Sequence, residues 1–330
     1  MVKKLVNDPH SFVEDSLRGF ARAHADLVAV ESNIVIRRTP KPEGKVGIIS
    51  GGGSGHEPLH AGFVGVGMLD AAVPGAVFTS PTPDPILAAT TAADHGAGVV
   101  YLVKNYTGDV LNFDTAAELS ELSGIEVRQV LIDDDVAVED SLYTAGRRGV
   151  AGTFLVEKVV GASAERGDSL DEVVAIAERA VANVATMGLA LAPCTVPHAE
   201  RASFDLADDE IELGVGIHGE PGRRTAPMAT ADELTDQLFD AVQEELALTA
   251  GERVVVLVNG LGATPLAELY IVFARVAQRL DELGVQLVRS HVGDVVTSLD
   301  MAGVSVTLLR VDDELLDLYD APACTPAFRR

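Results

Sequence analysis

Two histidines in this sequence each lie next to a glycine and follow apolar segments. His56 ends the stretch GGGSGH after the apolar residues 45–50, and His218 lies within GVGIHGEPG at residues 214–222. Glycine lets a backbone approach a ligand closely, and histidine can act near neutral pH as an acid, a base or a nucleophile. Both segments are therefore candidate sites for chemistry on a small bound molecule. For His218 taken alone, an ordinary loop histidine is the competing interpretation.

The glycine-rich stretch at residues 51–55 also fits the kind of turn that holds a nucleotide phosphate. A phosphate loop requires Gly-Lys-Ser or Gly-Lys-Thr after four intervening residues, and the sequence has no such lysine here. The register of the dinucleotide motif GxGxxG is also imperfect. These details argue against a nucleotide site at this stretch.

Lys104 and Asp109 come directly after a third apolar segment, residues 98–103, in the sequence KNYTGD. Because open α/β sheets bind ligands at the carboxyl ends of their strands, both side chains are well placed to contact a bound polyol. The alternative for Asp109 is that it only caps the helix that follows.

Other polar clusters carry less weight as sites. The acidic runs 133–135 and 208–210 lack the spacing of a calcium loop, so solvated turns are the favoured interpretation. Cys194 and Cys324 lie far apart and show no zinc-ligand spacing, which indicates ordinary thiols. We therefore expect no metal site on this chain. Four further histidines have no partner at a diagnostic spacing: His60, His95, His198 and His291.

The elements that must position these residues alternate between strands and helices, which indicates an α/β protein. Residues 1–185 are expected to form one α/β domain with the glycine-rich segment, His56 and Asp109, and residues 186–330 a second one with His218. Strands are expected at residues 33–38, 45–50, 98–103, 127–132, 212–217, 253–258, 286–290 and 304–310. Helices are expected at residues 8–21, 85–94, 109–122, 153–187 (two helices, divided near 167–168), 234–248 and 265–283.

The composition excludes several classes of partner. The 330 residues include 50 acidic and 25 basic ones, for a formal net charge of -25. Such a surface repels nucleic acid and anionic lipid, so neither is an expected partner. No apolar run approaches the ~20 residues of a membrane span, and the amino terminus lacks a signal-peptide core. We expect a cytoplasmic protein, and its acidity would suit a high-salt cytoplasm.

Motifs in eight segments, spread in order over nearly the whole chain, resemble those of one family. The segments are KKLVNDP at 3–9, GSGHEP at 53–58, FTSP at 78–81, NYTGD at 105–109, GRRGVAGT at 146–153, GIHGEPG at 216–222, VNGLGATP at 258–265 and TSLDM at 297–301. The chain resembles the substrate-binding K subunits of dihydroxyacetone kinases in their stand-alone, phosphotransferase-dependent form. The resemblance implies a homodimer of two-domain α/β subunits, with mixed sheets flanked by helices.

The resemblance also implies a role for each candidate residue. His218 would bond covalently to the carbonyl carbon of dihydroxyacetone and form a hemiaminal, which selects ketones over glycerol. His56 or Asp109 would orient or deprotonate the hydroxyl that attacks phosphorus, and the choice between them stays open. Asp109 and His218 would both contact the substrate, together with Gly53, Ser80 and Lys104.

The phosphoryl donor is expected on another protein, because no nucleotide site is found here and the chain ends at Arg330 without the helical nucleotide-binding domain of ATP-using relatives. The resemblance implies a separate L subunit that carries ADP and magnesium. A phosphotransferase-system protein would recharge it from phosphoenolpyruvate, and this chain itself would hold no cofactor. Two alternatives stay open: a kinase subunit for another short ketose such as erythrulose, and a ligand-binding transcriptional co-regulator of the same family.

Overall fold

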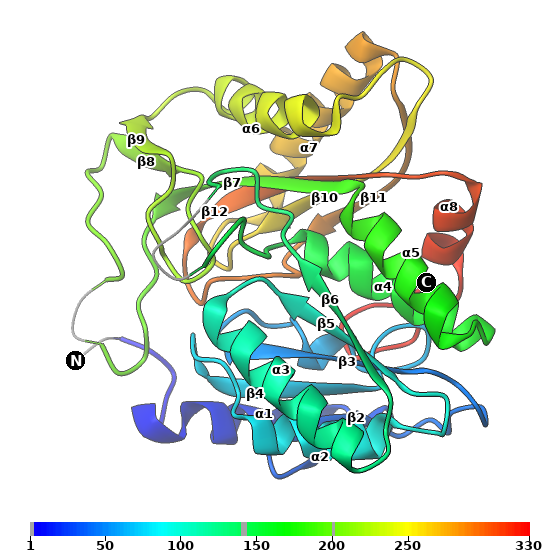
Figure 1. Ribbon diagram of the computed structural model, residues 1–330. Helices are drawn as coiled ribbons and strands as arrows, with labels where there is room; N and C mark the ends of the chain where they lie inside the picture. Colours follow the sequence, from blue (N-terminus) through cyan, green and yellow to red (C-terminus); the bar gives the residue numbers. More distant parts are fainter. Residues whose placement is uncertain (1–2, 140–143, 200–201) are drawn as a thin grey trace.

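The computed structural model describes residues 3–139, 144–199 and 202–330, and it contains two mixed sheets flanked by helices (Figure 1). The predicted fold class is confirmed. The first elements are η1 (Pro9–Ser11), α1 (Phe12–Ala23), β1 (Val28–Glu31), β2 (Ile34–Arg37), β3 (Gly47–Ser54), η2 (Ala61–Phe63), β4 (Ala71–Val77), α2 (Pro83–Ala93), β5 (Val99–Lys104), α3 (Thr107–Leu122) and β6 (Val127–Ile132). The later ones are α4 (Gly152–Arg166), α5 (Leu170–Val181), β7 (Val184–Ala192), β8 (Glu210–Leu213), β9 (Arg224–Pro227), α6 (Ala231–Leu246), β10 (Arg253–Gly260), α7 (Leu266–Leu283), β11 (Gln286–Gly293), β12 (Ala302–Arg310) and α8 (Asp313–Asp320).

The first sheet has the strand order β1-β2-β4-β3-β5-β6, and its strands β4, β3, β5 and β6 are parallel. Side chains alternate along β5 because successive residues of a strand point to opposite faces. Tyr101 and Val103 pack with α2 and α3, while Val100 and Leu102 pack in the core formed with α4 and α5. A strand buried on both faces needs a continuous apolar sequence, which is what β5 has.

The second sheet has the order β11-β10-β12-β7-β8-β9, with β10 and β11 parallel and the other neighbours antiparallel. Val254 and Val256 of β10 pack with α6 and α7. Val255 and Leu257, on the opposite face, belong to the same core as α4 and α5. These two helices thus lie between the sheets and join them through one continuous core (Figure 1).

The C-terminal segment returns to the first half of the chain after α8. Cys324 pairs with Val66 in a short bridge, and the Ala327 amide donates to the Gly62 carbonyl at 2.9 Å. Helix α4 contacts both β3 and β12. The division of the chain into two domains near residue 185 stays a prediction. Within the described ranges, no helix is long and apolar enough to cross a membrane.

The glycine-rich stretch is part of strand β3 rather than a loop after it. A Cβ at Gly51 would lie 2.7 Å from the Val73 oxygen, and one at Gly53 would lie 2.5 Å from the Thr79 nitrogen. Real Cβ contacts are longer than this, so the neighbouring backbone leaves room only for hydrogen. These glycines permit close packing at the carboxyl end of the strand.

Several segments differ from the expected elements, and β1, β9 and α8 lie outside all of the expected ranges. Strand β4 was not predicted, because Pro74 and Gly75 usually interrupt strands. Residues 184–187, expected at the end of a helix, begin β7. Residues 214–217, expected as a strand, form a turn after β8, where Gly214 takes a φ of 81° that favours glycine.

Candidate active site

A cavity of about 510 Å³ lies where the parallel strands of the first sheet end and a loop of the second half faces them. The loop between β8 and β9 carries His218. Carboxyl ends of parallel strands are the usual place for a ligand site in α/β folds. The lining contains four of the six predicted site residues. All of its lining residues are Gly53, Phe78, Ser80, Tyr106, Gly108, Asp109, Ser203, His218, Gly219, Glu220 and Pro221.

His56 follows β3 and is buried beside this cavity, with its ring 4.8 Å from that of His218. Its Nδ1 lies 2.8 Å from the carbonyl oxygen of Thr297, which can only accept, so Nδ1 carries the hydrogen. The other nitrogen, Nε2, is buried and has no hydrogen-bond partner among the described residues. Burial first, and then the charges of His218 and Lys104, lower the pKa of His56 well below its usual range. His56 is therefore a neutral imidazole with a free lone pair.

Phe78 supports His56 from an unusual backbone conformation. Its ring stacks on the His56 ring at 5.1 Å between centroids, and its φ is 55°, which is rare for a bulky residue. The Phe78 amide donates to the Ser54 carbonyl at 2.9 Å and holds this turn against the end of β3. Local backbone strain of this kind clusters at functional sites.

His218 is oriented by Glu220, two residues further along the chain. Its Nδ1 lies 2.7 Å from Oε1 of Glu220, and its backbone amide donates to Oε2 at 2.9 Å. Burial raises the pKa of Glu220, but the charges of His218 and Arg148 outweigh burial, and the pKa falls to about 2. The carboxylate thus accepts from Nδ1–H of His218, which leaves Nε2 as the nucleophilic nitrogen.

Arg148 forms buried hydrogen bonds that hold the start of the loop that carries His218. It is fully buried, its Nε donates to Asp135 Oδ2 at 2.7 Å, and a terminal nitrogen donates to the Gly214 carbonyl at 2.8 Å. Burial raises the pKa of Asp135 to about 6 despite this ion pair. The neighbouring Asp134 accepts from the Val150 and Gly152 amides. The prediction that residues 133–135 form a solvated turn is wrong for these two aspartates, which are buried structural anchors.

Asp109 occupies the first turn of α3, whose positive dipole end favours a carboxylate. The residue that precedes the helix is Tyr106, and no side chain caps it, so Asp109 is not a helix cap. Its Oδ1 is buried without a hydrogen-bond partner in the part of the chain that the structure describes. The acceptor is therefore available to a ligand in the cavity.

Lys104 is the last residue of β5. Its side chain lies next to Gly51 and Gly52 of β3 and does not belong to the cavity lining. Its Nζ is 3.3 Å from the Gly51 carbonyl and 2.6 Å from His60 Nε2. A Cβ at Gly52 would lie 2.5 Å from Nζ and 3.4 Å from Oδ2 of Asp109. The backbone at Gly52, which carries no side chain, therefore lies close both to Lys104 and to Asp109 of the cavity lining.

Ser80 and Tyr106 bring hydroxyl groups to the cavity lining, and the spacing of residues in the sequence did not single out Tyr106 or Glu220. Ser80 accepts from Asn112 Nδ2 at 3.2 Å. Tyr106 has a buried hydroxyl without a partner in residues 3–139, 144–199 and 202–330, and its ring meets that of His218 edge-on at 4.6 Å. Tyr106 and Glu220 lie inside quoted motifs, but no spacing rule singles them out. The same residue ranges contain no group of three His, Cys, Asp or Glu that could hold a metal ion.

Comparisons with known proteins place the chain in a family. The chain is 53% identical, over 99% of its length and 100% of the relative's, to a protein of Listeria innocua named PTS-dependent dihydroxyacetone kinase 1, dihydroxyacetone-binding subunit DhaK. The dihydroxyacetone kinase of C. freundii, solved with AMP-PNP and Mg²⁺, superposes with a TM-score of 0.92 at 35% identity, over 100% of this chain and 61% of that one.

A solved protein that is not named as a kinase subunit is also similar. The dihydroxyacetone kinase operon co-activator Dha-DhaQ superposes with a TM-score of 0.90 at 38% identity, over 95% of this chain and 97% of that one. The family described as the Dak1 domain matches residues 18–327. The chain belongs to the Dak1 domain family.

Proposed function

We propose that this chain is the dihydroxyacetone-binding subunit of a phosphotransferase-system-dependent dihydroxyacetone (glycerone) kinase. The observation that carries the proposal is the cavity itself. In or beside it, the nucleophilic nitrogen of His218 lies near three buried polar atoms that have no hydrogen-bond partner among the described residues: Nε2 of His56, Oδ1 of Asp109 and the hydroxyl of Tyr106. A short polyol with a carbonyl group supplies partners for all of them, since buried polar groups are rarely left unpaired.

The first step is capture of the ketone. Nε2 of His218 attacks the carbonyl carbon, the π electrons move to the carbonyl oxygen, and this oxygen takes up a proton to give the hemiaminal hydroxyl. The imidazole becomes positive as the bond forms, until Nδ1 releases its proton. Glu220 stays anionic at neutral pH, because its pKa is about 2, and it stabilises that charge through the hydrogen bond at Nδ1.

The second step is phosphorylation of a terminal hydroxyl. Either Nε2 of His56 or the carboxylate of Asp109 takes the hydroxyl proton as the oxygen attacks phosphorus. His56 suits a base because it is neutral and its lone pair is free. Gly53, Ser80 and Lys104 complete the substrate contacts, and the product is dihydroxyacetone phosphate.

The phosphoryl donor in this proposal is an L subunit with bound ADP and magnesium, recharged by a phosphotransferase-system protein from phosphoenolpyruvate. The end-to-end match with a relative named as a PTS-dependent subunit supports this arrangement. A homodimer in the cytoplasm is part of the same proposal.

A phosphorylation assay tests the proposed function. The chain is mixed with an L subunit charged from phosphoenolpyruvate and with dihydroxyacetone, and formation of dihydroxyacetone phosphate is followed. We expect product only when both subunits are present. If the L subunit carries phosphate and the chain binds dihydroxyacetone but no product forms, the kinase assignment is wrong.

The second candidate is a co-activator that binds dihydroxyacetone without phosphorylating it, and the similarity to Dha-DhaQ favours it. Capture by His218 alone is enough for a sensor. A free base in the site is needed only for phosphoryl transfer, so the unpartnered atoms of His56 and Asp109 favour the kinase. A ketone adduct without any transfer from the L subunit is the outcome expected for the co-activator.

A further inference from the structure

Three ionisable side chains form a buried chain that ends at Lys104. Oε1 of Glu157, in the middle of α4, lies 2.5 Å from Nδ1 of His60, and Nε2 of His60 lies 2.6 Å from Nζ of Lys104. Glu157 has no exposed surface, and Lys104 and His60 are buried as well. The contacts join three different elements: α4, the segment after β3 and the end of β5.

The hydrogen positions in this chain follow from the partners at its ends. A lysine ammonium has only donors, so His60 must accept at Nε2 and carry its hydrogen on Nδ1, which donates to Glu157. Burial, followed by the charge of Lys104, lowers the pKa of His60 well below its usual range, so the ring is neutral as this arrangement requires. His60 therefore links the two residues, because its Nδ1–H donates to Glu157 while its Nε2 accepts from Lys104.

Lys104 is held at two of its three N–H groups by this arrangement. One N–H donates to His60 and a second to the Gly51 carbonyl. Burial lowers the pKa of Lys104, and the charges of Asp109 and Glu157 offset only part of this lowering. The described residues make no further hydrogen bond to Nζ, so the third N–H can point to Asp109 or to a substrate oxygen, past Gly52, which has no side chain.

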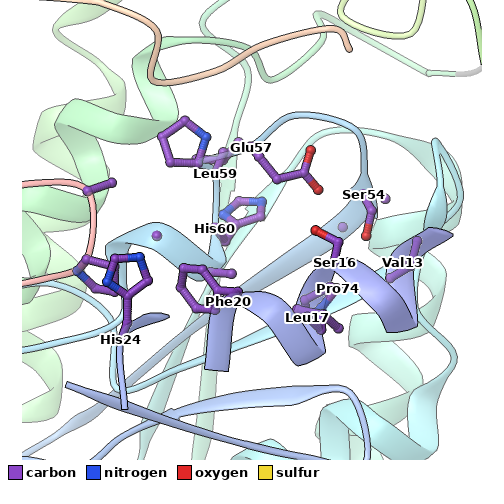
Figure 2. Close-up of a pocket in the computed structure, with 17 residues that line it drawn as sticks. Val13, Ser16, Leu17, Phe20, His24, Ser54, Glu57, Leu59, His60 and Pro74 are labelled. Carbon is purple, nitrogen blue, oxygen red and sulfur yellow. The ribbon is translucent and has the colours of Figure 1, made fainter. Parts of the chain in front are cut away.

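A second cavity, of about 430 Å³, lies beside Gly52, Gly53 and Ser54 of β3 and is lined by His60 (Figure 2). Figure 2 shows the His60 ring between the segment of Glu57 and the residues of α1, such as Phe20. Apart from Gly53, its lining residues differ from those of the cavity that contains His218, and its walls are mostly apolar. A small aromatic base can reach the position of the His60 ring from this side.

We propose that His60 and Glu157 are positioning residues that fix the ammonium of Lys104 for the substrate. The inference rests on the proposed function, because it needs a substrate beside Lys104. It assigns a role to two residues that no sequence spacing connects. His60 acts through its two nitrogens in different ways: Nδ1 anchors the ring on Glu157, and Nε2 accepts from Lys104.

Matched variants separate these two contacts. The amide oxygen of Gln reaches the place of a histidine Nε2, whereas the amide of Asn overlies Nδ1. H60Q can keep the acceptor for Lys104, and H60N can keep only the contact with Glu157. We expect kcat/KM for dihydroxyacetone to fall about tenfold or more further in H60N than in H60Q, chiefly through KM. Equal kcat/KM in both variants, or values equal to wild type, would overturn the proposal.

Rescue by imidazole gives the second readout. H60G enlarges the cavity of Figure 2 at the ring position, and we expect added imidazole to restore at least about tenfold in kcat/KM without effect on wild type. Formation of the dihydroxyacetone adduct at His218 shows that the H60G variant is folded at the site. If this variant forms the adduct but imidazole does not restore its KM, the proposal is overturned. If wild type neither forms an adduct nor accepts phosphate, the proposed function itself has failed.

Discussion

Replacement of Glu220 by Gln keeps the shape of the side chain and an acceptor for Nδ1 of His218 but removes the negative charge. In the wild type the pKa of Glu220 falls from 4.5 to about 2. At about 1.36 kcal/mol for each tenfold change in proton affinity, this shift means that the surroundings favour the anion by a few kcal/mol. His218 and Arg148 share this attraction, because burial acts in the opposite direction.

E220Q removes the charged partner of Nδ1 of His218, and a hydrogen bond to a charged group contributes on the order of 2 kcal/mol, which is a factor of at least about 20. We therefore expect the rate of adduct formation with dihydroxyacetone to fall roughly 20-fold at neutral pH. The assay is intact-protein mass spectrometry at timed intervals after mixing with the ketone.

Glu212 supplies the matched control. It accepts from the Gly222 amide and from Thr225, so it supports the same loop without touching His218. E212Q should form the adduct at nearly the wild-type rate. Adduct formation by E220Q at the wild-type rate, or the same loss in E212Q, would refute the role given to the charge of Glu220.

Two further predictions concern the groups that follow capture. D109N should form the adduct normally but lose phosphoryl transfer by about a hundredfold or more, as expected for loss of a general base or of a carboxylate that orients the hydroxyl; transfer at the wild-type rate would remove Asp109 from this step. His56 is held neutral by burial, so its ring resonances, assigned by comparison with H56Q in proton NMR, should titrate at a pH below the usual 6.5. A His56 that gains its proton above pH 6.5 would contradict its description as a neutral base.

The sequence identified the cavity residues that follow strands or lie between glycines. Gly53 and Asp109 come together in one lining because the carboxyl ends of parallel strands meet at one edge of the first sheet, and the loop between β8 and β9 brings His218 to the same lining. Periodicity also placed most helices and strands, including β6, whose bounds match the expected ones. Strand β4 escaped because its proline and glycine resemble a turn, although the packing at Gly75 leaves no room for a side chain.

The sequence could not identify residues that act through contacts made only by the fold. His60 and Glu157 are 97 positions apart, and the hydrogen bond between them depends on the packing of α4 against β3. Asp135 belongs to an acidic run that resembles a solvated turn, and only the burial of Arg148 beside it reveals the ion pair. No local pattern predicts such pairs, since each depends on tertiary packing.

Covalent capture by His218 is the central claim, and intact-protein mass spectrometry under gentle conditions tests it most directly. The account predicts a gain in mass equal to one dihydroxyacetone for the wild-type chain, and no gain for H218A, whose fold should persist because His218 is partly exposed on a loop. An adduct that survives in H218A, or a wild-type chain that shows none, would contradict the account.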